Sequence, residues 1–309
     1  MDSSRISIVA VVVTYKRHEL LTDCLLALGD QGLDHIVVVN NGGSKDSLTC
    51  QAVGEISARI QSPITLINTL ENIGGAGGFA LGIESALEKK CDFVWLMDDD
   101  CIPNNSSLHA LLKAAKFDSK DSLGRPYGFY ASRVFWGDQS LHKMNVPEFT
   151  AQWFNPTSQA NNSLEIRRCS FVSVLIPTAV VQKIGLPIRE FFIWGDDVEY
   201  TLRISEFYGY GQYCLDSIVH HMTALNEKVD FRSISENSAW KYQYAFVNSH
   251  AMLWGRGDYL QAVLSLFKTL FDLTSGVSTI QTKKTVLRGV IKIPKQARIV
   301  ATYIKDLNI

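Results

Sequence analysis

Three consecutive carboxylates, Asp98, Asp99 and Asp100, have the residue type and spacing that suit metal and phosphate chemistry. They follow the apolar run at 93–97, which is typical of a strand buried on both faces of a parallel sheet. Open α/β sheets bind ligands at the carboxyl ends of their strands. Carboxylate oxygens bind Mg²⁺ or Mn²⁺, and such ions usually hold substrate phosphates. The alternative is a solvated acidic turn that caps the next helix.

A second acidic pair, Asp196 and Asp197, follows the aromatic segment at 191–194 and Gly195. A carboxylate beside apolar rings can have a raised pKa and act as a general base. The alternative is a plain N-cap of the helix expected over 198–207. His220 and His221 end the strand expected over 211–219, where they are candidate metal ligands or structural hydrogen-bonding groups.

A glycine-rich segment lies one predicted helix before the three carboxylates, with glycine at positions 74, 75, 77 and 78. The helix predicted over 79–89 would begin just after these glycines. A glycine loop at a helix N-terminus suits an anion, because free N–H groups and the helix dipole both face it. A flexible turn is the alternative. The spacing is not that of a dinucleotide fingerprint after a first strand.

The segments that must position these residues alternate between strand and helix patterns. Strands are expected at 6–14, 36–39, 64–67 and 93–98, with helices at 19–30, 46–59, 79–89 and 106–116. This alternation predicts an α/β fold with a mostly parallel sheet. Further strands are expected at 128–136 and 169–176, and further helices at 177–184, 238–254 and 259–273. Residues 138–162 are predicted to be a long loop that carries acceptor specificity.

Composition narrows the class of protein. The net charge of −1 gives no global electrostatic argument for nucleic-acid binding. The six cysteines include no C-x-x-C pair, and we interpret them as reduced thiols of a cytoplasmic protein. The first five residues lead directly into a strand pattern, so no signal peptide is expected. No apolar stretch is long enough to span a bilayer.

The last part of the chain is basic and amphipathic. Residues 283–305 contain seven Lys or Arg and no acidic residue, with aliphatic side chains between them. Such a segment suits an anionic membrane surface, and the alternative is a helix that packs on its own domain or on a second subunit. We therefore predict two parts, a domain over 1–225 and a helical region over 226–309 with this tail.

Several motifs in this order resemble the large family-2 inverting glycosyltransferases with a GT-A fold. Within that family the chain is most similar to the galactofuranosyltransferase-like branch, with bacterial rhamnosyltransferases as neighbours. The resemblance covers about residues 6–225. The motifs are Thr14-Tyr15-x-Arg17, Asn40 at a strand end, Asn72-x-Gly-Gly-Ala-Gly-Gly-Phe79, Met97-Asp98-Asp99-Asp100, Trp194-Gly-Asp-Asp197-Val-Glu and His221-Met.

The resemblance implies a role for each matching residue. The donor nucleotide-sugar site would comprise Thr14, Arg17, Asn40, Asn72, Gly74, Gly75, Asp98 and Asp99. Mg²⁺ or Mn²⁺ would be held by Asp98, Asp100 and His221, with His220 the less favoured histidine. Asp197 would be the catalytic base, with Asp196 and Trp194 at the acceptor. Asn40 departs from the family pattern, which usually has Asp there, and Val247 stands where the family usually has Arg before Asn248.

The implied function is metal-dependent, inverting transfer of galactofuranose from UDP-galactofuranose to a glycan or lipid-linked glycan in cell-surface polysaccharide synthesis. The enzyme would lie at the inner face of the plasma membrane as a peripheral protein, and its C-terminal helices could also pair two copies of the chain. One alternative is a rhamnosyltransferase that uses dTDP-rhamnose. Another is a non-catalytic sugar-nucleotide-binding scaffold subunit. A nucleotidyltransferase would be expected to carry a Gly-rich loop after the first strand, and residues 15–18 contain no glycine.

Overall fold

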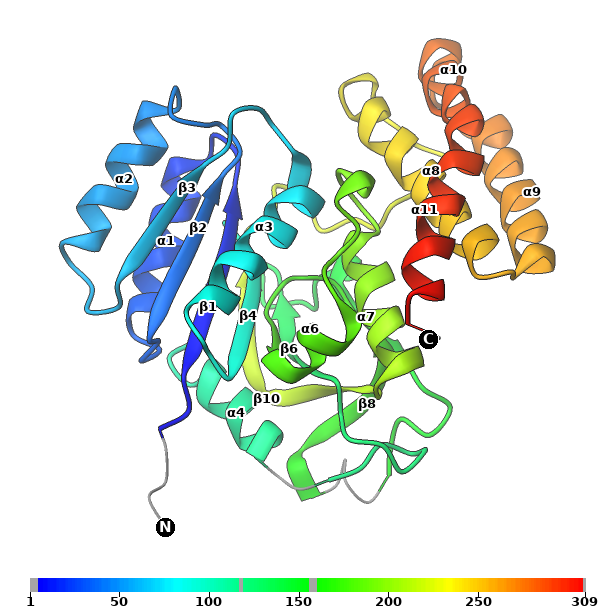
Figure 1. The fold of residues 1–309 in the computed structure, drawn as a ribbon. Helices are drawn as coiled ribbons and strands as arrows, with labels where there is room; N and C mark the ends of the chain where they lie inside the picture. Colours follow the sequence, from blue (N-terminus) through cyan, green and yellow to red (C-terminus); the bar gives the residue numbers. More distant parts are fainter. Residues whose placement is uncertain (1–4, 117–118, 156–159, 308–309) are drawn as a thin grey trace.

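The computed structural model describes residues 5–116, 119–155 and 160–307 (Figure 1). One ten-stranded mixed sheet has the order β3-β2-β1-β4-β9-β6-β10-β8-β7, with β5 paired to β10. Strands β3, β2, β1 and β4 run parallel, as predicted, whereas β9 is antiparallel to both of its neighbours. The strands are β1 (Ile8–Thr14), β2 (His35–Asn40), β3 (Ile64–Asn68), β4 (Phe93–Asp98), β5 (Cys101–Pro103), β6 (Phe129–Phe135), β7 (Glu148–Phe149), β8 (Ser163–Arg168), β9 (Val174–Pro177) and β10 (Gly211–His221).

Helices cover both faces of this sheet, because its central strands are apolar on both sides. Every residue of β1 is buried, and alternate residues enter two cores. Val12 packs with residues of α1 (His18–Gly29), α2 (Ser47–Ser57) and α4 (Ser107–Lys116). Val11 packs with residues of α3 (Gly74–Glu88), α6 (Thr178–Ile184) and α7 (Asp196–Phe207). The α/β prediction is therefore confirmed.

Helix α3 begins at Gly74, five residues earlier than predicted, so the glycines lie inside its first turns. Two glycines of this helix face strand β1 at close range. A Cβ atom on Gly78 would lie 2.5 Å from Val13, and one on Gly82 would lie 2.3 Å from Val11. These two glycines let α3 pack against the sheet and are not free for a ligand.

Two other predicted elements differ in the structure. The strand expected over 169–176 is split into the connection after β8 and the short strand β9. Phe171 and Val172 in that connection are buried, so core packing rather than strand pairing explains their apolar pattern. The predicted loop over 138–162 contains a 3₁₀ turn, η1 (Lys143–Asn145), and β7, and its residues 156–159 lie outside the described part.

The C-terminal helices form a bundle beside α7, on the far side of the sheet from α1 and α2 (Figure 1). Val286, Ile293 and Val300 of the basic tail are buried within this bundle, so the tail packs on its own chain and is not a free amphipathic helix. None of the described helices combines the length and hydropathy needed to cross a bilayer. The bundle comprises α8 (Ala239–Gly255), α9 (Tyr259–Ser275), α10 (Ile280–Leu287) and α11 (Ile293–Lys305), with 3₁₀ turns η3 (Glu236–Ser238) and η4 (Arg288–Lys292).

Candidate active site

The three carboxylates stand at the carboxyl end of β4, beside the end of β1. Asp99 is fully buried and accepts a hydrogen bond of 2.6 Å from the Thr14 hydroxyl. Arg17, which follows β1, pairs with Asp99 and also with Asp100, whose Oδ2 lies 2.7 Å from Nη1. Thr14 is itself 1% exposed. Its hydroxyl therefore orients Asp99, and its predicted contact with the nucleotide stays a prediction, whereas Arg17 is partly exposed.

His221, at the end of β10, meets the same carboxylates. Its Nε2 lies 3.1 Å from Asp100 Oδ1, while its Nδ1 lies 2.8 Å from the Asn145 side-chain oxygen. Because that oxygen only accepts, Nδ1 carries a proton and Nε2 points at the carboxylate. His220 lies instead beside Phe135, with ring centroids 6.2 Å apart. The structure thus brings His221, and not His220, to Asp100.

This arrangement fits a divalent cation. Asp100 Oδ1 is buried and, apart from the contact with His221, has no hydrogen-bond partner among the described residues. Side-chain ligand atoms of Asp100, Cys101 and His221 all lie within 4.8 Å of one another. A proton can occupy the contact between the imidazole and the carboxylate in the ligand-free chain, and a cation can replace it. Asn145 would then act as the outer partner that fixes the histidine tautomer.

The charges of this cluster are unequal. Burial raises the pKa of Asp98 to about 7 and that of Asp99 to about 6. Burial acts on Asp100 in the same direction, but the hydrogen bond and charge of His221, together with Arg17, lower its pKa to about 2. Asp100 is therefore the carboxylate that stays ionised most firmly, as a metal ligand requires.

The start of α3 lies next to a tight turn of the aromatic loop, which we define as residues 189–195. Gly74 has φ +74°, and a Cβ atom there would lie 2.0 Å from the Phe192 carbonyl oxygen. That oxygen accepts a hydrogen bond from the Ala76 N–H. A Cβ atom on Gly75 would meet no atom of the described residues within 4 Å, so open space adjoins α3 there. The exposed Asn72 accepts from the Gly74 N–H and orders this start.

Asn40 is fully buried, and its amide group is engaged in hydrogen bonds within the chain. Its nitrogen donates to the Gly43 carbonyl and to Asn68 Oδ1, and its oxygen accepts from the Gly42 N–H. The side chain therefore shapes the turn after β2, and its predicted contact with a nucleobase stays a prediction.

The aromatic loop holds its residues in uncommon conformations. Phe192 has φ 62° and ψ −61°, and the Ile193 N–H donates to the Phe191 carbonyl, which together define a strained γ-turn. Trp194 has φ 63°. Asn248 of α8 donates from one amide nitrogen to the carbonyl oxygens of Phe191, Ile193 and Trp194, at 3.0, 3.2 and 2.8 Å. Asn248, on helix α8, therefore holds the aromatic loop in this conformation, and we call these hydrogen bonds the clamp.

Asp196 and Asp197 open α7 directly after this loop. Gly195 precedes them with φ 93°, and the Val198 N–H donates to Asp197 Oδ1 at 2.7 Å. Burial raises the pKa of Asp197, and burial together with the charge of Asp197 raises that of Asp196 further. The charge of Asp98 acts on the pKa of Asp196 in the same direction.

Aromatic side chains of α8 contact the aromatic residues that precede Asp196 and Asp197 in the chain. The ring of Trp194 meets Tyr242 edge to face at 5.3 Å, and Phe192 stacks on Tyr244 at 5.0 Å. Trp240 is 44% exposed at the rim. Aromatic faces that are partly exposed beside a carboxylate can hold a sugar ring or another apolar acceptor group.

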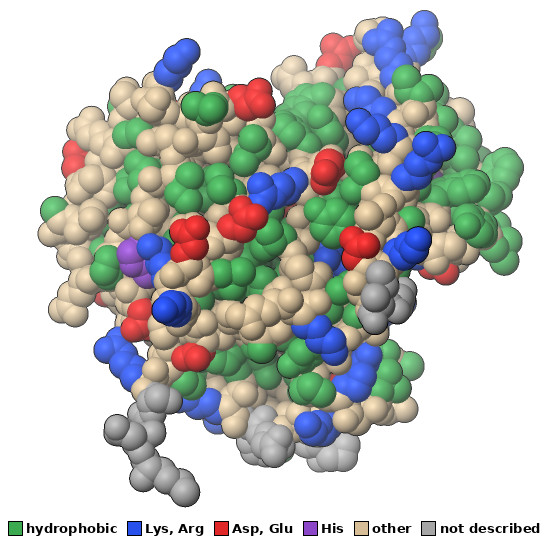
Figure 2. Space-filling view, viewed as in Figure 1, with side chains coloured by type: hydrophobic (Ala, Val, Ile, Leu, Met, Phe, Trp, Pro, Cys, Tyr) green, Lys and Arg blue, Asp and Glu red, His purple; other side chains and the backbone are tan. Residues whose placement is uncertain are grey.

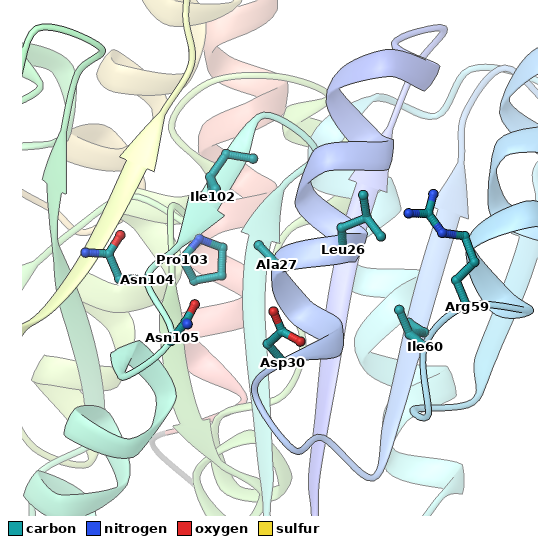
Figure 3. Close-up of a pocket in the computed structure, with 9 residues that line it drawn as sticks. All are labelled: Leu26, Ala27, Asp30, Arg59, Ile60, Ile102, Pro103, Asn104 and Asn105. Carbon is teal, nitrogen blue, oxygen red and sulfur yellow. The ribbon is translucent and has the colours of Figure 1, made fainter.

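A cavity of about 690 Å³ lies elsewhere on the molecule and contains none of the predicted site residues. Its lining comes from α1 and the residue after it, the segment after α2, and β5 with the segment after it, including Leu26, Asp30, Arg59 and Asn104 (Figure 3). It is separate from the acidic cluster and from the aromatic loop.

Two residues that shape the site had no role assigned from the sequence. Asn145 lies in the long loop, and Asn248 lies in a segment to which no catalytic role was given. Both act on other residues through side-chain amides, 76 and 54–57 positions away in sequence. The only sequence signal near Asn248 was Val247, which stands where the family usually has Arg.

Comparisons with known proteins agree with this arrangement. The family model described as "Glycosyltransferase like family 2" matches residues 5–243. A galactofuranosyltransferase GlfT1 from Mycobacterium tuberculosis is 41% identical over 230 residues, 72% of each chain. The GlfT1 from Mycolicibacterium smegmatis is 30% identical over 207 residues, 63% of this chain and 64% of that protein.

Solved structures share the fold at low identity. The crystal structure of GalNAc-T7 with UDP, GalNAc and Mn²⁺ gives a TM-score of 0.56 at 13% identity, covering 93% of this chain and 55% of that one. The structure of S. aureus TarS 1-349 gives 0.52 at 15% identity, covering 97% and 92%. The chain thus spans just over half of the GalNAc-T7 chain and just under two thirds of the M. smegmatis protein.

Proposed function

The chain belongs to the glycosyltransferase-like family 2, and we propose that it is an inverting glycosyltransferase that uses UDP-galactofuranose. Its acceptor would be a hydroxyl of a glycan or lipid-linked glycan in cell-surface polysaccharide synthesis. The observation that carries the proposal is the meeting of Asp100 with His221 at the carboxyl end of β4, in a chain whose second acidic pair, Asp196 and Asp197, begins α7 directly after the aromatic loop. The 41% identity to a galactofuranosyltransferase supports the choice of sugar.

The donor side of the site is assigned to the acidic cluster and the start of α3. Asp100 and His221 would hold a divalent cation, with Asp98 beside them, and the histidine nitrogen favours Mn²⁺ over Mg²⁺. When bound, such an ion neutralises negative charge on the leaving diphosphate. The open N-terminus of α3 at Gly75 would face the donor phosphates. Arg17 would exchange a carboxylate partner for a phosphate oxygen.

The acceptor side is assigned to the aromatic loop and the start of α7. Asp197 would take the proton from the acceptor hydroxyl as its oxygen attacks the anomeric carbon opposite the leaving group. Its raised pKa favours proton uptake. Trp194 and the α8 aromatics would hold the acceptor, with Asp196 orienting it. A single displacement inverts the anomeric centre without an enzyme nucleophile.

The cysteines support this assignment of roles. Burial raises the pKa of Cys24, Cys101 and Cys169, so none of these three thiols offers a reactive thiolate. A double displacement through cysteine would need such a thiolate near the donor.

The division into a domain over 1–225 and a helical region over 226–309 remains a proposal. Asn248 of α8 holds the aromatic loop, and Arg256, after α8, contacts Glu199 of α7 at 3.0 Å. The helical region would therefore complete the acceptor side of the site rather than form an independent unit.

The test is a donor panel with the purified full chain, Mn²⁺ and a membrane-extracted acceptor. We expect UDP release with UDP-galactofuranose, and a product of inverted configuration by NMR. Release with dTDP-rhamnose alone would favour the rhamnosyltransferase alternative. Nucleotide-dependent thermal stabilisation without transfer from any donor would favour the scaffold alternative.

Two variants assign the catalytic role. Asp197→Ala should lower kcat by about 10²–10⁴-fold while UDP-sugar binding is retained. Glu55→Ala, at an exposed position of α2, is the matched control and should transfer at the wild-type rate. Near-normal turnover by Asp197→Ala would contradict its role as the base.

A further inference from the structure

Helix α9 has apolar side chains on two opposite faces. Ala262, Thr269 and Leu273 are buried on the inner face, toward the bundle. Leu260, Leu264, Phe267 and Phe271 are exposed by 75%, 57%, 68% and 70%. Their spacing of four, three and four residues places them along one stripe of the helix surface. The inner face of α9 packs against the bundle, whereas its outer face has no packing partner among the described residues.

The outer stripe continues past the end of α9. Val277, in the connection to α10, and Ile280, the first residue of α10, are exposed, as is Ile291 in η4. Single exposed aliphatic residues are common on protein surfaces, but a stripe of four large apolar side chains along one helix marks an interaction surface. We name the outer stripe of α9 with Val277 and Ile280 the α9 surface.

Basic residues adjoin the α9 surface. The Lys283 ammonium donates to the carbonyl oxygens of Thr274 and Gly276, which joins the basic segment to the C-terminal end of α9. Figure 2 shows Lys and Arg side chains over α10 and α11, beside the hydrophobic side chains at the α9 edge of the molecule. The other basic residues of this segment are Lys284, Arg288, Lys292, Lys295, Arg298 and Lys305.

We propose that the α9 surface docks on an anionic lipid bilayer, with its apolar stripe inserted at the headgroup level and the basic segment against the headgroups. The bilayer satisfies both features, because it offers an apolar layer beside negative charge. A symmetric pair of copies joined through α9 would bring two segments without acidic residues close together, and like charges oppose such contact. The docking element is thus α9, since apolar residues of the basic tail are buried in the bundle.

Docking through α9 would also set the side from which the acceptor approaches the site, an inference that rests on the proposed function. Helix α8 packs against α9 and carries Tyr242, which contacts Trp194 at the acceptor side. A chain docked through α9 would hold α8 close to the bilayer. A glycan attached to a membrane lipid could then reach Asp197 without leaving the surface.

The experiment is co-sedimentation of the full chain with phosphatidylcholine vesicles and with vesicles that also contain phosphatidylglycerol. We expect binding to the anionic vesicles, which high salt weakens. The double variant Phe267→Asp/Phe271→Asp should lower vesicle partitioning by about tenfold or more. The matched control is Leu48→Asp, at an exposed apolar position of α2, and it should bind like the wild type.

Three results would overturn the proposal. The wild type could remain in the supernatant with anionic vesicles, or the double variant could still sediment with them. Alternatively, light scattering could show a wild-type dimer that the double variant converts to a monomer, which would make the α9 surface a subunit interface. Circular dichroism establishes that the variants are folded, as expected because both phenylalanines are exposed.

An activity measurement separates this proposal from the proposed function. With a water-soluble acceptor, the double variant should transfer sugar at the wild-type rate. With a vesicle-embedded lipid-linked acceptor, its rate should fall in parallel with vesicle binding. If the wild type and all variants lack transfer while vesicle binding follows the expected pattern, the proposed function fails and the docking surface stands.

Discussion

Replacing Asn248 by alanine tests whether the clamp on the aromatic loop positions the catalytic carboxylate. The amide nitrogen of Asn248 is shared by three loop carbonyls and the side chain is 1% exposed. Because the amide offers two N–H groups to three carbonyls, the clamp is equivalent to about two hydrogen bonds, or about 1–3 kcal/mol at about 0.5–1.5 kcal/mol each. The strained conformations of Phe192 and Trp194 cost about 1–3 kcal/mol each. The clamp and the strain are therefore of similar size, and without Asn248 the loop should relax.

We expect Asn248→Ala to lower the free energy of unfolding by about 1–2 kcal/mol, measured by urea denaturation, because relaxation of the strained loop offsets part of the lost hydrogen bonds. Because Trp194 and Asp197 lie at the end of the loop and just after it, a shift of about 1 Å should lower kcat by about 100-fold. The KM for the donor sugar should change less than kcat, since Asp100 and His221 lie on other elements and the loop reaches the start of α3 through the Phe192 carbonyl alone among the described hydrogen bonds. Ser249→Ala is the matched control, because its hydroxyl contacts only its own helix.

A lower stability with unchanged kcat would refute this reasoning, because it would show that Asn248 supports the fold without positioning the base. A rise in the donor KM that accounts for the whole loss of activity would also refute it. Asn248→Asp offers a second variant of the same size. It replaces the amide donor by a carboxylate that faces three carbonyl oxygens, so it should lose at least as much activity as Asn248→Ala.

The remaining predictions concern the cation site, the base and a buried ion pair. His221→Ala should abolish stabilisation of the chain by Mn²⁺ in thermal unfolding, and Asn145→Ala, which frees the histidine tautomer, should weaken Mn²⁺ binding by about 10–100-fold in calorimetry. An ordinary aspartate titrates near pH 4. Because the pKa of Asp197 is raised, its basic form is lost at a higher pH than this as the pH falls, so the acid limb of the pH profile of kcat should lie above about pH 4. A limb at the usual carboxyl pKa would contradict the base assignment. Glu199→Ala should lower the free energy of unfolding by about 3–5 kcal/mol in urea titration, because it leaves the fully buried Arg203 without its carboxylate; an unchanged midpoint and slope would contradict this expectation.

Asn40 and Thr14 show what a motif position leaves open about the role of a side chain. Both residues stand at strand ends where a ligand site was expected, and both are buried with hydrogen bonds inside the chain. A strand-end position places a residue at the correct edge of the sheet. Whether its side chain faces the ligand or the neighbouring backbone depends on the turn that follows, which short-range patterns do not specify.

The C-terminal tail shows a similar limit. Its alternation of basic and aliphatic residues is compatible with a membrane helix and with a helix packed on its own chain. Val286 and Val300 are buried, so these aliphatic side chains pack on the chain itself, and contact of the basic residues with a membrane stays a proposal. The sequence of α9, in contrast, is apolar on most sides of the helix, and only the position of α8 separates its buried face from its exposed one.

Local sequence patterns were enough to predict the alternating α/β order, the parallel first half of the sheet and the position of Asp98–Asp100 at a strand end. Buried parallel strands have continuous apolar runs, and three consecutive carboxylates interrupt such a run, so short-range composition suffices for these features. The contact of His221 with Asp100, its orientation by Asn145 and the clamp of Asn248 on the loop before Asp197 are visible only in the folded chain. These contacts join residues more than 50 positions apart, and their geometry depends on how whole elements pack.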